Sequence, residues 1–155
     1  MTTHQWTDAE LVNQPAAYWT GVAYEALIGF TRARMAEQGF SQPQFWLLRH
    51  LSKHDISPDG DGMTVAELRE AMRGYLRAED DLEAEAEILL GRGWLTRDGD
   101  GRLWITEPGD EARAGLKEHA PAIREGIHRG IDDADYVTTL RVLQQMIRNT
   151  GAEPA

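Results

Sequence analysis

The fold is decided by the sixteen residues from Trp94 to Gly109, which read Trp-Leu-Thr-Arg-Asp-Gly-Asp-Gly-Arg-Leu-Trp-Ile-Thr-Glu-Pro-Gly. Two short apolar segments, near Leu95 and Leu103, flank the four residues 98–101, and the Asp-Gly pairs in this segment favour the tight turns of β-hairpins. The last four residues of the stretch have the composition of a helix start, with a proline in the first turn. The stretch therefore predicts a two-stranded hairpin that leads directly into a helix.

Three helices are expected in the first half of the chain. Apolar residues recur at helical spacing over residues 15–38, which predicts a long amphipathic helix. Ser41 is followed three residues later by Gln44, and Thr64 is followed in the same way by Glu67. Both pairs form capping boxes, the usual signature of a helix N-terminus. Two shorter helices are therefore expected to begin at these residues.

Three further helices complete the predicted order of elements. Residues 79–90 place leucines along one side and carboxylates along the rest, which predicts an amphipathic helix just before the hairpin. A long helix is expected from Glu107, with a kink at Pro121, because a proline inside a helix removes one backbone donor. A last helix is expected to begin at Asp132 or Asp133, either of which can cap it.

Composition narrows the class of protein. The chain has 155 residues, a formal net charge of −10 and no cysteine, which excludes disulfides and thiolate-bound zinc. Its N-terminus is polar and no apolar run approaches the length of a membrane span, so a cytoplasmic protein is expected. The sequence has no serine-nucleophile motif and no phosphate-binding glycine loop, so we expect neither an enzyme nor a cofactor.

A metal site is not expected either. Residues 55–60 begin like a calcium-binding EF-hand loop, with oxygen donors at alternate positions and a glycine at the sixth. Position twelve is Ala66 where an EF-hand needs glutamate, so an ordinary surface loop is favoured. The five histidines show no metal-binding spacing.

The order of these elements, together with two motifs around the hairpin, resembles the MarR family of bacterial transcription regulators. The motifs are Asp-Gly-Arg at 100–102 and Ile-Thr-Glu-Pro-Gly at 105–109, and the segment 133–151 is similar to the last helix of actinobacterial members. The resemblance implies a mainly α fold: a winged helix-turn-helix with a two-stranded β wing, plus N- and C-terminal dimerisation helices. The implied parts, within a single unit 1–155, are a winged-helix lobe 41–105 and a helical dimerisation region 15–38 and 107–150.

The resemblance also implies partners and site residues. It implies a homodimer, a palindromic double-stranded DNA operator, action as a repressor, and a small aromatic or lipophilic effector. The candidate DNA-binding residues are wing and helix-flanking cations, which are Arg102, Arg97, Arg77, Arg73 and Arg69. The candidate effector pocket consists of Trp19, Trp46 and His50. For the arginines the alternative is a solvated role beside neighbouring acids, and for the tryptophans it is core packing.

One segment conflicts with DNA binding. Residues 79–87, where the family places its DNA-reading helix, contain six carboxylates and no cation. By the family pattern, the positions that face the groove are Glu79, Asp80, Asp81, Glu83 and Ala84. Carboxylates repel phosphate, although they can accept a hydrogen bond from a cytosine amine. The alternative function is a winged-helix dimer that has lost DNA binding and engages a basic protein or a small ligand through its acidic face.

Overall fold

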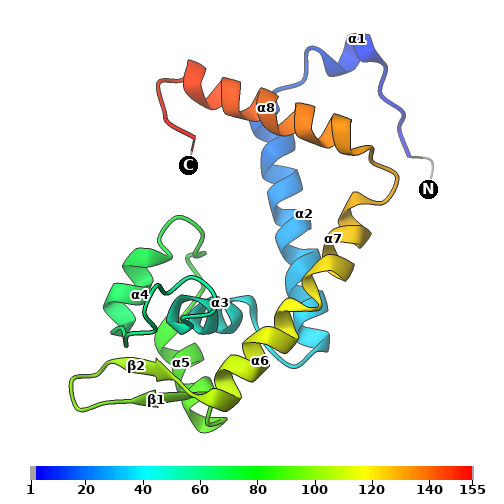
Figure 1. Ribbon diagram of the computed structural model, residues 1–155. Helices are drawn as coiled ribbons and strands as arrows, with labels where there is room; N and C mark the ends of the chain where they lie inside the picture. The colour runs from blue at the N-terminus through cyan, green and yellow to red at the C-terminus, as the bar shows by residue number, and fades with distance from the viewer. Residues whose placement is uncertain (1–2, 155) are drawn as a thin grey trace. The chain divides into compact units, whose positions relative to one another are not determined.

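The computed structural model describes residues 3–154, which form eight helices and one antiparallel sheet of two strands (Figure 1). The chain divides into two compact units, Met1–His119 and Ala120–Ala155. The first contains α1 (Asp8–Leu11), α2 (Ala16–Glu37), α3 (Gln42–Leu51), α4 (Val65–Ala71), α5 (Leu82–Gly91), β1 (Leu95–Arg97), β2 (Leu103–Ile105) and α6 (Glu107–Lys117). The second contains α7 (Ala120–His128) and α8 (Asp133–Asn149).

The two predicted capping boxes begin α3 and α4. The Ser41 side chain accepts a hydrogen bond from the Gln44 backbone N–H, and the Gln44 side chain accepts one from the Ser41 N–H. Thr64 and Glu67 make the same reciprocal pair at the start of α4. Each box satisfies two backbone donors that a helix N-terminus otherwise leaves without a partner. A third capping box starts α1, a helix that we did not predict.

The predicted hairpin is confirmed. Leu95 lies opposite Ile105 and Arg97 lies opposite Leu103, in antiparallel register. Met63, just before α4, forms an isolated bridge with Leu103 through two backbone hydrogen bonds of 2.8 and 3.1 Å. The hairpin is therefore fixed at its base to the segment that leads into α4.

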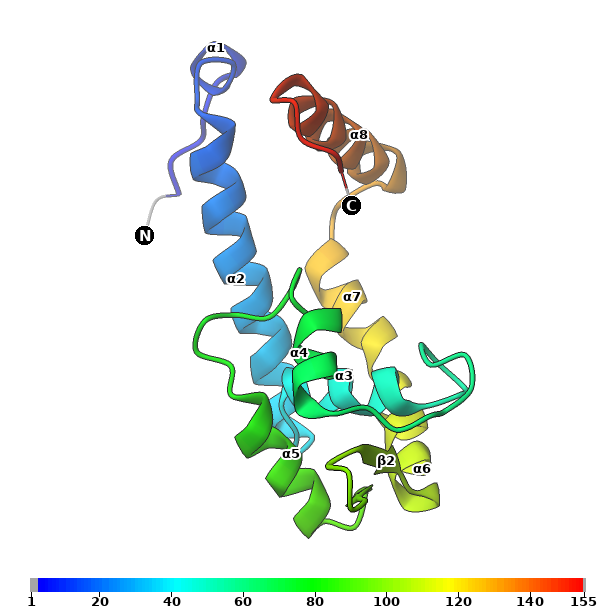
Figure 2. The ribbon, with the colours of Figure 1, turned by 90° about the vertical axis from the view of Figure 1, so that its left-hand side faces the viewer.

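The core of the first unit lies between α3, α4, α5 and the hairpin, which gather around one apolar cluster (Figure 2). Helix α3 packs against α5, α6 and β2. The fully buried leucines are Leu47, Leu48, Leu51, Leu68, Leu82, Leu89, Leu95 and Leu103. Burial of each leucine contributes roughly 1.5–3 kcal/mol, so this cluster is the main stabilising feature of the lobe.

Two helix boundaries differ from the prediction. Helix α5 begins at Leu82, three residues later than expected. The long helix expected from Glu107 ends at Lys117, and α7 starts at Ala120, so Pro121 lies in the first turn of a new helix. Proline is tolerated in that turn, because the N–H that it lacks would have no helical partner there. The predicted kink is therefore a complete break.

The second unit has little apolar burial of its own. Helix α8 begins after Asp132, one of the two predicted caps, and neither α7 nor α8 contains a buried residue. Its exposed large apolar side chains include Val137, Leu140, Val142, Met146 and Ile147. Across residues 3–154, no helix combines the length and the apolarity that crossing a bilayer requires.

Candidate nucleic-acid interface

Helix α5 has one face in the core and one face open to solvent. Leu82, Ala86 and Leu89 are buried against α3, α4 and the base of the hairpin. The opposite side exposes Glu83, Ala84, Glu87 and Ile88. We call this exposed side the outer face of α5. Because α4 precedes it and the hairpin follows it, this helix occupies the place of the reading helix in a winged helix-turn-helix.

Half of the carboxylates in the acidic segment lie before this helix. The Asp81 side chain caps α5 by accepting a hydrogen bond from the Ala84 N–H. Asp80 accepts two hydrogen bonds from the guanidinium of Arg32, at 2.7 and 2.9 Å. Glu79 accepts one from Arg77, at 2.6 Å. The expectation that Glu79, Asp80 and Asp81 face the groove from within the helix is therefore corrected.

Arg97, at the end of β1, is held by α5. Its Nη1 lies 2.8 Å from Glu87 Oε1, and its Nη2 lies 3.6 Å from Glu83 Oε1. The two carboxylates are four residues apart, so they lie on one side of the helix. This wing arginine therefore neutralises part of the acidic outer face.

Arg102, just before β2, is held by α4 and by the loop before that helix. Its guanidinium donates to the Gly62 carbonyl at 2.8 Å and to both carboxylate oxygens of Glu67 at 3.1 Å. Trp104 packs on Gly62, where a Cβ would lie 2.5 Å from the indole ring, so a larger residue would force the ring to move. The Trp104 indole N–H and the Arg102 backbone N–H both donate to Asp98, and they lower the pKa of that carboxyl. These hydrogen bonds therefore fix the position of the wing relative to α4.

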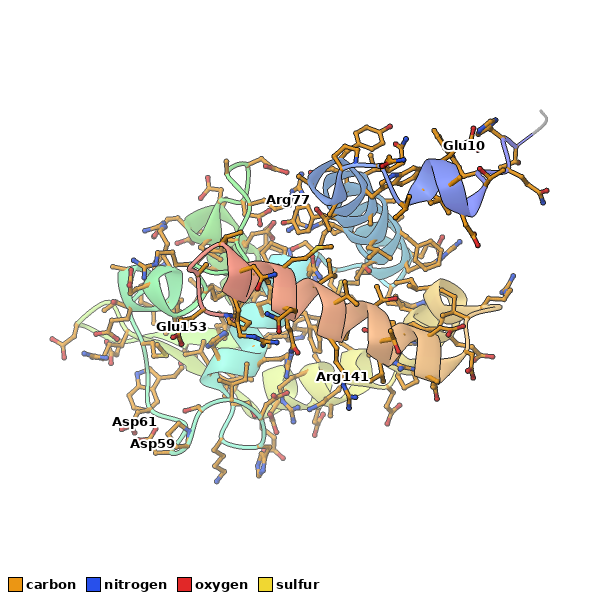
Figure 3. All side chains as sticks on the ribbon, turned by 90° about the horizontal axis from the view of Figure 1, so that it is seen from above. Glu10, Asp59, Asp61, Arg77, Arg141 and Glu153 are labelled. Carbon is orange, nitrogen blue, oxygen red and sulfur yellow. The ribbon has the colours of Figure 1, made fainter. Side chains whose placement is uncertain are left out.

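The three helix-flanking arginines differ in their surroundings. Arg69, on α4, is exposed, and within residues 3–154 no carboxylate lies at ion-pair distance from it. Arg73 is also exposed and pairs with Glu70, at 3.3 Å. Arg77 lies beside α2 (Figure 3), where it binds Glu25 at 3.0 Å. The structure therefore leaves Arg69 and Arg73 on the surface but fastens Arg77 to another helix.

Two of the three predicted effector-pocket residues meet at Tyr75, which we did not predict. The Trp46 ring stands edge-on to the Tyr75 ring with centroids 4.7 Å apart. His50 stacks on Tyr75 at 6.0 Å, and its Nε2 hydrogen-bonds the tyrosine hydroxyl. Burial, with a smaller contribution from the nearby Arg49, lowers the pKa of His50. Tyr75 lies in an irregular connection with no periodic pattern, so no sequence signal places it here.

Trp19, the third predicted pocket residue, packs in a different aromatic group. Its ring stands edge-on to Trp6 at 6.0 Å and to Tyr18 at 5.4 Å. The structure therefore brings Trp46 and His50 together and places Trp19 with the aromatic residues near the start of α2.

The loop that begins like an EF-hand uses its first carboxylate in an ion-pair cluster. Asp55, with a side chain only 4% exposed, contacts Arg49 at 3.1 Å, Arg113 at 3.2 Å and Lys117 at 3.3 Å. We call this group the Asp55 cluster. Among the described residues, no set of three or more histidines and carboxylates is arranged to hold a metal ion. Three cations therefore compensate the charge of Asp55 and join the loop to α3 and α6.

Among known proteins, only solved structures show similarity to this chain. No family model matches the sequence, and no curated protein matches it. Among solved structures, a MarR family regulator from Silicibacter pomeroyi is 18% identical with a TM-score of 0.68, over 94% of this chain and 99% of that one. A MarR family protein from Mycobacterium tuberculosis is 18% identical with a TM-score of 0.64, over 86% and 95% of the two chains.

A third similar structure, a putative MarR family regulator from Clostridium acetobutylicum, is 15% identical with a TM-score of 0.63, over 88% of this chain and 98% of that one. Identities this low establish the architecture and not the activity. The protein therefore has the winged helix-turn-helix fold of the MarR transcriptional regulators.

Proposed function

We propose that the protein is a cytoplasmic, DNA-binding transcriptional regulator of the MarR type, which acts as a homodimeric repressor. The observation that carries this proposal is the outer face of α5. It is left open while the rest of the helix is buried, and the hairpin wing lies beside it. In helix-turn-helix proteins this face enters the major groove. The wing then follows the neighbouring backbone or minor groove.

The proposed DNA contacts are surface cations of the wing and of the α4 segment, which are Arg97, Arg102, Arg69 and Arg73. Arg97 and Arg102 have carboxylate partners in the free protein, but these partners are largely exposed. Exposed ion pairs contribute only about 0–1 kcal/mol each, so DNA phosphate can replace them at small cost. The net charge of −10 weakens long-range attraction, but binding depends on the local charge at the contacting face.

A homodimer is supported by exposed apolar side chains on helices outside the winged-helix lobe. Those on α2 are Tyr18, Trp19, Val22, Tyr24 and Leu27. Those on α8 include Leu140 and Met146. Soluble monomers rarely expose so much apolar surface on one or two helices. A two-fold dimer would present two reading helices to a palindromic operator with half-sites about 34 Å apart.

An effector site is proposed around Trp46, His50 and Tyr75, for a small aromatic or lipophilic compound. Aromatic rings with a few polar groups are the usual lining of such sites. The Mycobacterium tuberculosis protein has also been solved in complex with p-aminosalicylic acid, an aromatic acid. Trp19 belongs to this site only if a second copy or a rearrangement brings it there.

A second candidate function follows from the charge of the outer face. Glu83 and Glu87 are exposed on α5, where a DNA-reading helix normally carries neutral or basic residues. A winged-helix dimer with this surface could instead bind a basic protein or a small ligand. Binding of a duplex separates the two candidates.

Fluorescence anisotropy with the promoter of the protein's own gene, over a series of salt concentrations, tests the proposal. We expect specific binding, with log K falling linearly with log salt. Arg102→Ala should weaken binding and reduce the slope by about 1, the change that removal of one phosphate-binding cation produces. Arg34→Ala is the matched control, since Arg34 lies on α2 and pairs with Glu37. Wild-type protein that binds no duplex even at low salt would contradict the proposal and favour the second candidate.

A further inference from the structure

The connection between α4 and α5 is fastened to α2 at two points, and it passes beside that helix (Figure 2). Arg32 of α2 donates two hydrogen bonds to Asp80, at 2.7 and 2.9 Å. Arg77 donates two hydrogen bonds to Glu25 of α2, at 3.0 and 3.1 Å. We call these four residues the α2 brace. Glu25 and Arg32 are seven residues apart, so they lie on one face of α2, about 10 Å apart along its axis.

The two points of attachment have opposite polarity. At one point α2 supplies the arginine and the connection supplies the carboxylate, while at the other point the roles are reversed. A slide of α2 in one direction would bring Glu25 toward Asp80, and a slide in the other direction would bring Arg32 toward Arg77. Like charges oppose both movements. The Arg77 backbone N–H also donates to Asp80 at 2.9 Å, so the two points are joined within the connection itself. The brace therefore fixes one register of α2 against the entrance of α5.

One of the two attachments, Arg32–Asp80, is more protected from solvent than the ion pairs of the wing. The Asp80 side chain is 4% exposed and the Arg77 side chain is 18% exposed. Burial alone would raise the pKa of Asp80, but the Arg32 guanidinium and the Arg77 N–H outweigh it and lower that pKa. Screening by water and salt is weak at Asp80, so the Arg32–Asp80 pair is the more strictly held of the two attachments.

The brace acts at the first turn of the reading helix. Asp80 immediately precedes Asp81, whose side chain caps α5. Helix α2 is one of the two helices whose exposed apolar side chains support the proposed dimer. The connection therefore links a dimer-forming helix directly to the start of the helix that meets DNA.

We propose that Arg77 and Asp80, with Glu25 and Arg32, are positioning residues that set the distance and orientation between the two reading helices of the dimer. This inference rests on the proposed function. It gives Arg77 a role other than the phosphate contact expected from the sequence, because its guanidinium is held on α2. The DNA property that the brace controls is discrimination between half-site spacings, and not affinity for a single half-site.

Glu25→Gln is the most informative test, because Glu25 is 65% exposed and its substitution removes the charge from one attachment without disturbing the core. The readout is anisotropy with palindromic duplexes whose half-site spacing differs by one base pair in either direction, together with a single half-site duplex. We expect the preference for the best spacing to fall about fivefold, which corresponds to the coupling of one contacting pair. Affinity for the single half-site should stay within about twofold of wild type.

Glu37→Gln is the matched control. It also removes one exposed carboxylate from α2, but the partner of Glu37 is Arg34, which lies on the same helix. It should change affinity for all duplexes equally and leave the spacing preference intact. If Arg77 is instead a phosphate contact, Glu25→Gln frees it and strengthens binding to every duplex, with no change in spacing preference. That result would overturn the inference.

The other outcomes separate this inference from the proposed function. In one outcome, the wild-type protein binds the palindrome while both Glu25→Gln and Asp80→Asn keep its spacing preference. That result overturns the inference about the α2 brace and leaves the proposed regulator function in place. Wild-type protein that binds no duplex overturns both. A urea unfolding curve for Asp80→Asn shows whether that variant is folded, and Glu25→Gln decides the question if it is not.

Discussion

Asp55→Asn removes one buried charge and keeps the shape of the side chain. In the wild-type protein, Asp55 is 4% exposed and contacts three cations, of which Arg113 is the most deeply buried at 7% exposed. The substitution leaves those cations in place without their shared carboxylate. It therefore measures how much the Asp55 cluster contributes to the stability of the lobe.

The expected decrease in stability follows from the burial of each pair. Breaking a fully buried pair by removing one partner costs roughly 3–5 kcal/mol, because the other charge is left uncompensated. Arg113 keeps a second partner, since Asp110 lies 2.8 Å from its Nε, so the cost falls below that range. The contacts from Arg49 and Lys117 are more exposed and contribute about 0–1 kcal/mol each. We expect the free energy of unfolding to fall by about 2–3 kcal/mol at pH 7.

The contribution of Asp55 to the free energy of unfolding depends on pH. Burial alone would raise the pKa of Asp55, but hydrogen bonds and charges from Arg49 and Lys117 outweigh it and hold that pKa below its ordinary value of 3.8. A carboxyl with a lowered pKa stabilises the folded state above its unfolded pKa and loses that contribution as pH falls through the folded value. The difference between wild type and Asp55→Asn should therefore shrink below about pH 4.

Urea unfolding at 25 °C, followed by tryptophan fluorescence and circular dichroism, measures the difference. Asp61→Asn is the matched control, because Asp61 is exposed in the same loop and, within residues 3–154, forms no ion pair. The reasoning fails if Asp55→Asn lies within about 0.5 kcal/mol of Asp61→Asn, the usual scatter for surface substitutions.

Two further predictions concern α3 and α6. Burial, with the Arg49 charge, holds the pKa of His50 below 6.5, so the unfolded chain binds more protons just under that pH. The free energy of unfolding should therefore fall as pH drops from about 6.5 to 5. If a His50→Gln variant shows the same pH dependence, the loss of stability does not come from His50. At Gly109 a Cβ would lie 2.1 Å from the Trp94 carbonyl oxygen, whereas at Gly115 it would meet nothing within 4 Å. Gly109→Ala should lower the free energy of unfolding by roughly 2–3 kcal/mol. Gly115→Ala should leave it unchanged or raise it by up to about 1 kcal/mol. Equal urea midpoints for the two variants would contradict the close packing of Gly109 on Trp94.

Elements with a local signal could be predicted from the sequence. The capping residues Ser41 and Thr64 lie three residues from their partners, and the Asp-Gly turn lies within the hairpin that it closes. Helix starts and tight turns depend on such short-range hydrogen bonds, so the helices of the lobe and the wing follow from residue type and spacing.

Contacts between distant residues could not be predicted in this way. Asp80, which lies just before α5, pairs with Arg32, which is 48 residues away. Tyr75 meets His50 across 25 residues, and neither position has a pattern that indicates the other. An arginine in a wing motif likewise gives no indication of which carboxylate will hold it. The sequence therefore identifies candidate cations, but their partners come from the tertiary fold.

Amide hydrogen exchange of the protein, with and without an operator duplex, tests the central claim most directly, because it locates the DNA on the molecule. If the outer face of α5 and the wing form the interface, the duplex should slow exchange in residues 82–91 and at the hairpin tip, residues 98–101. Protection confined to α1 and the first half of α2, or no protection under conditions where the duplex is bound, would contradict the account.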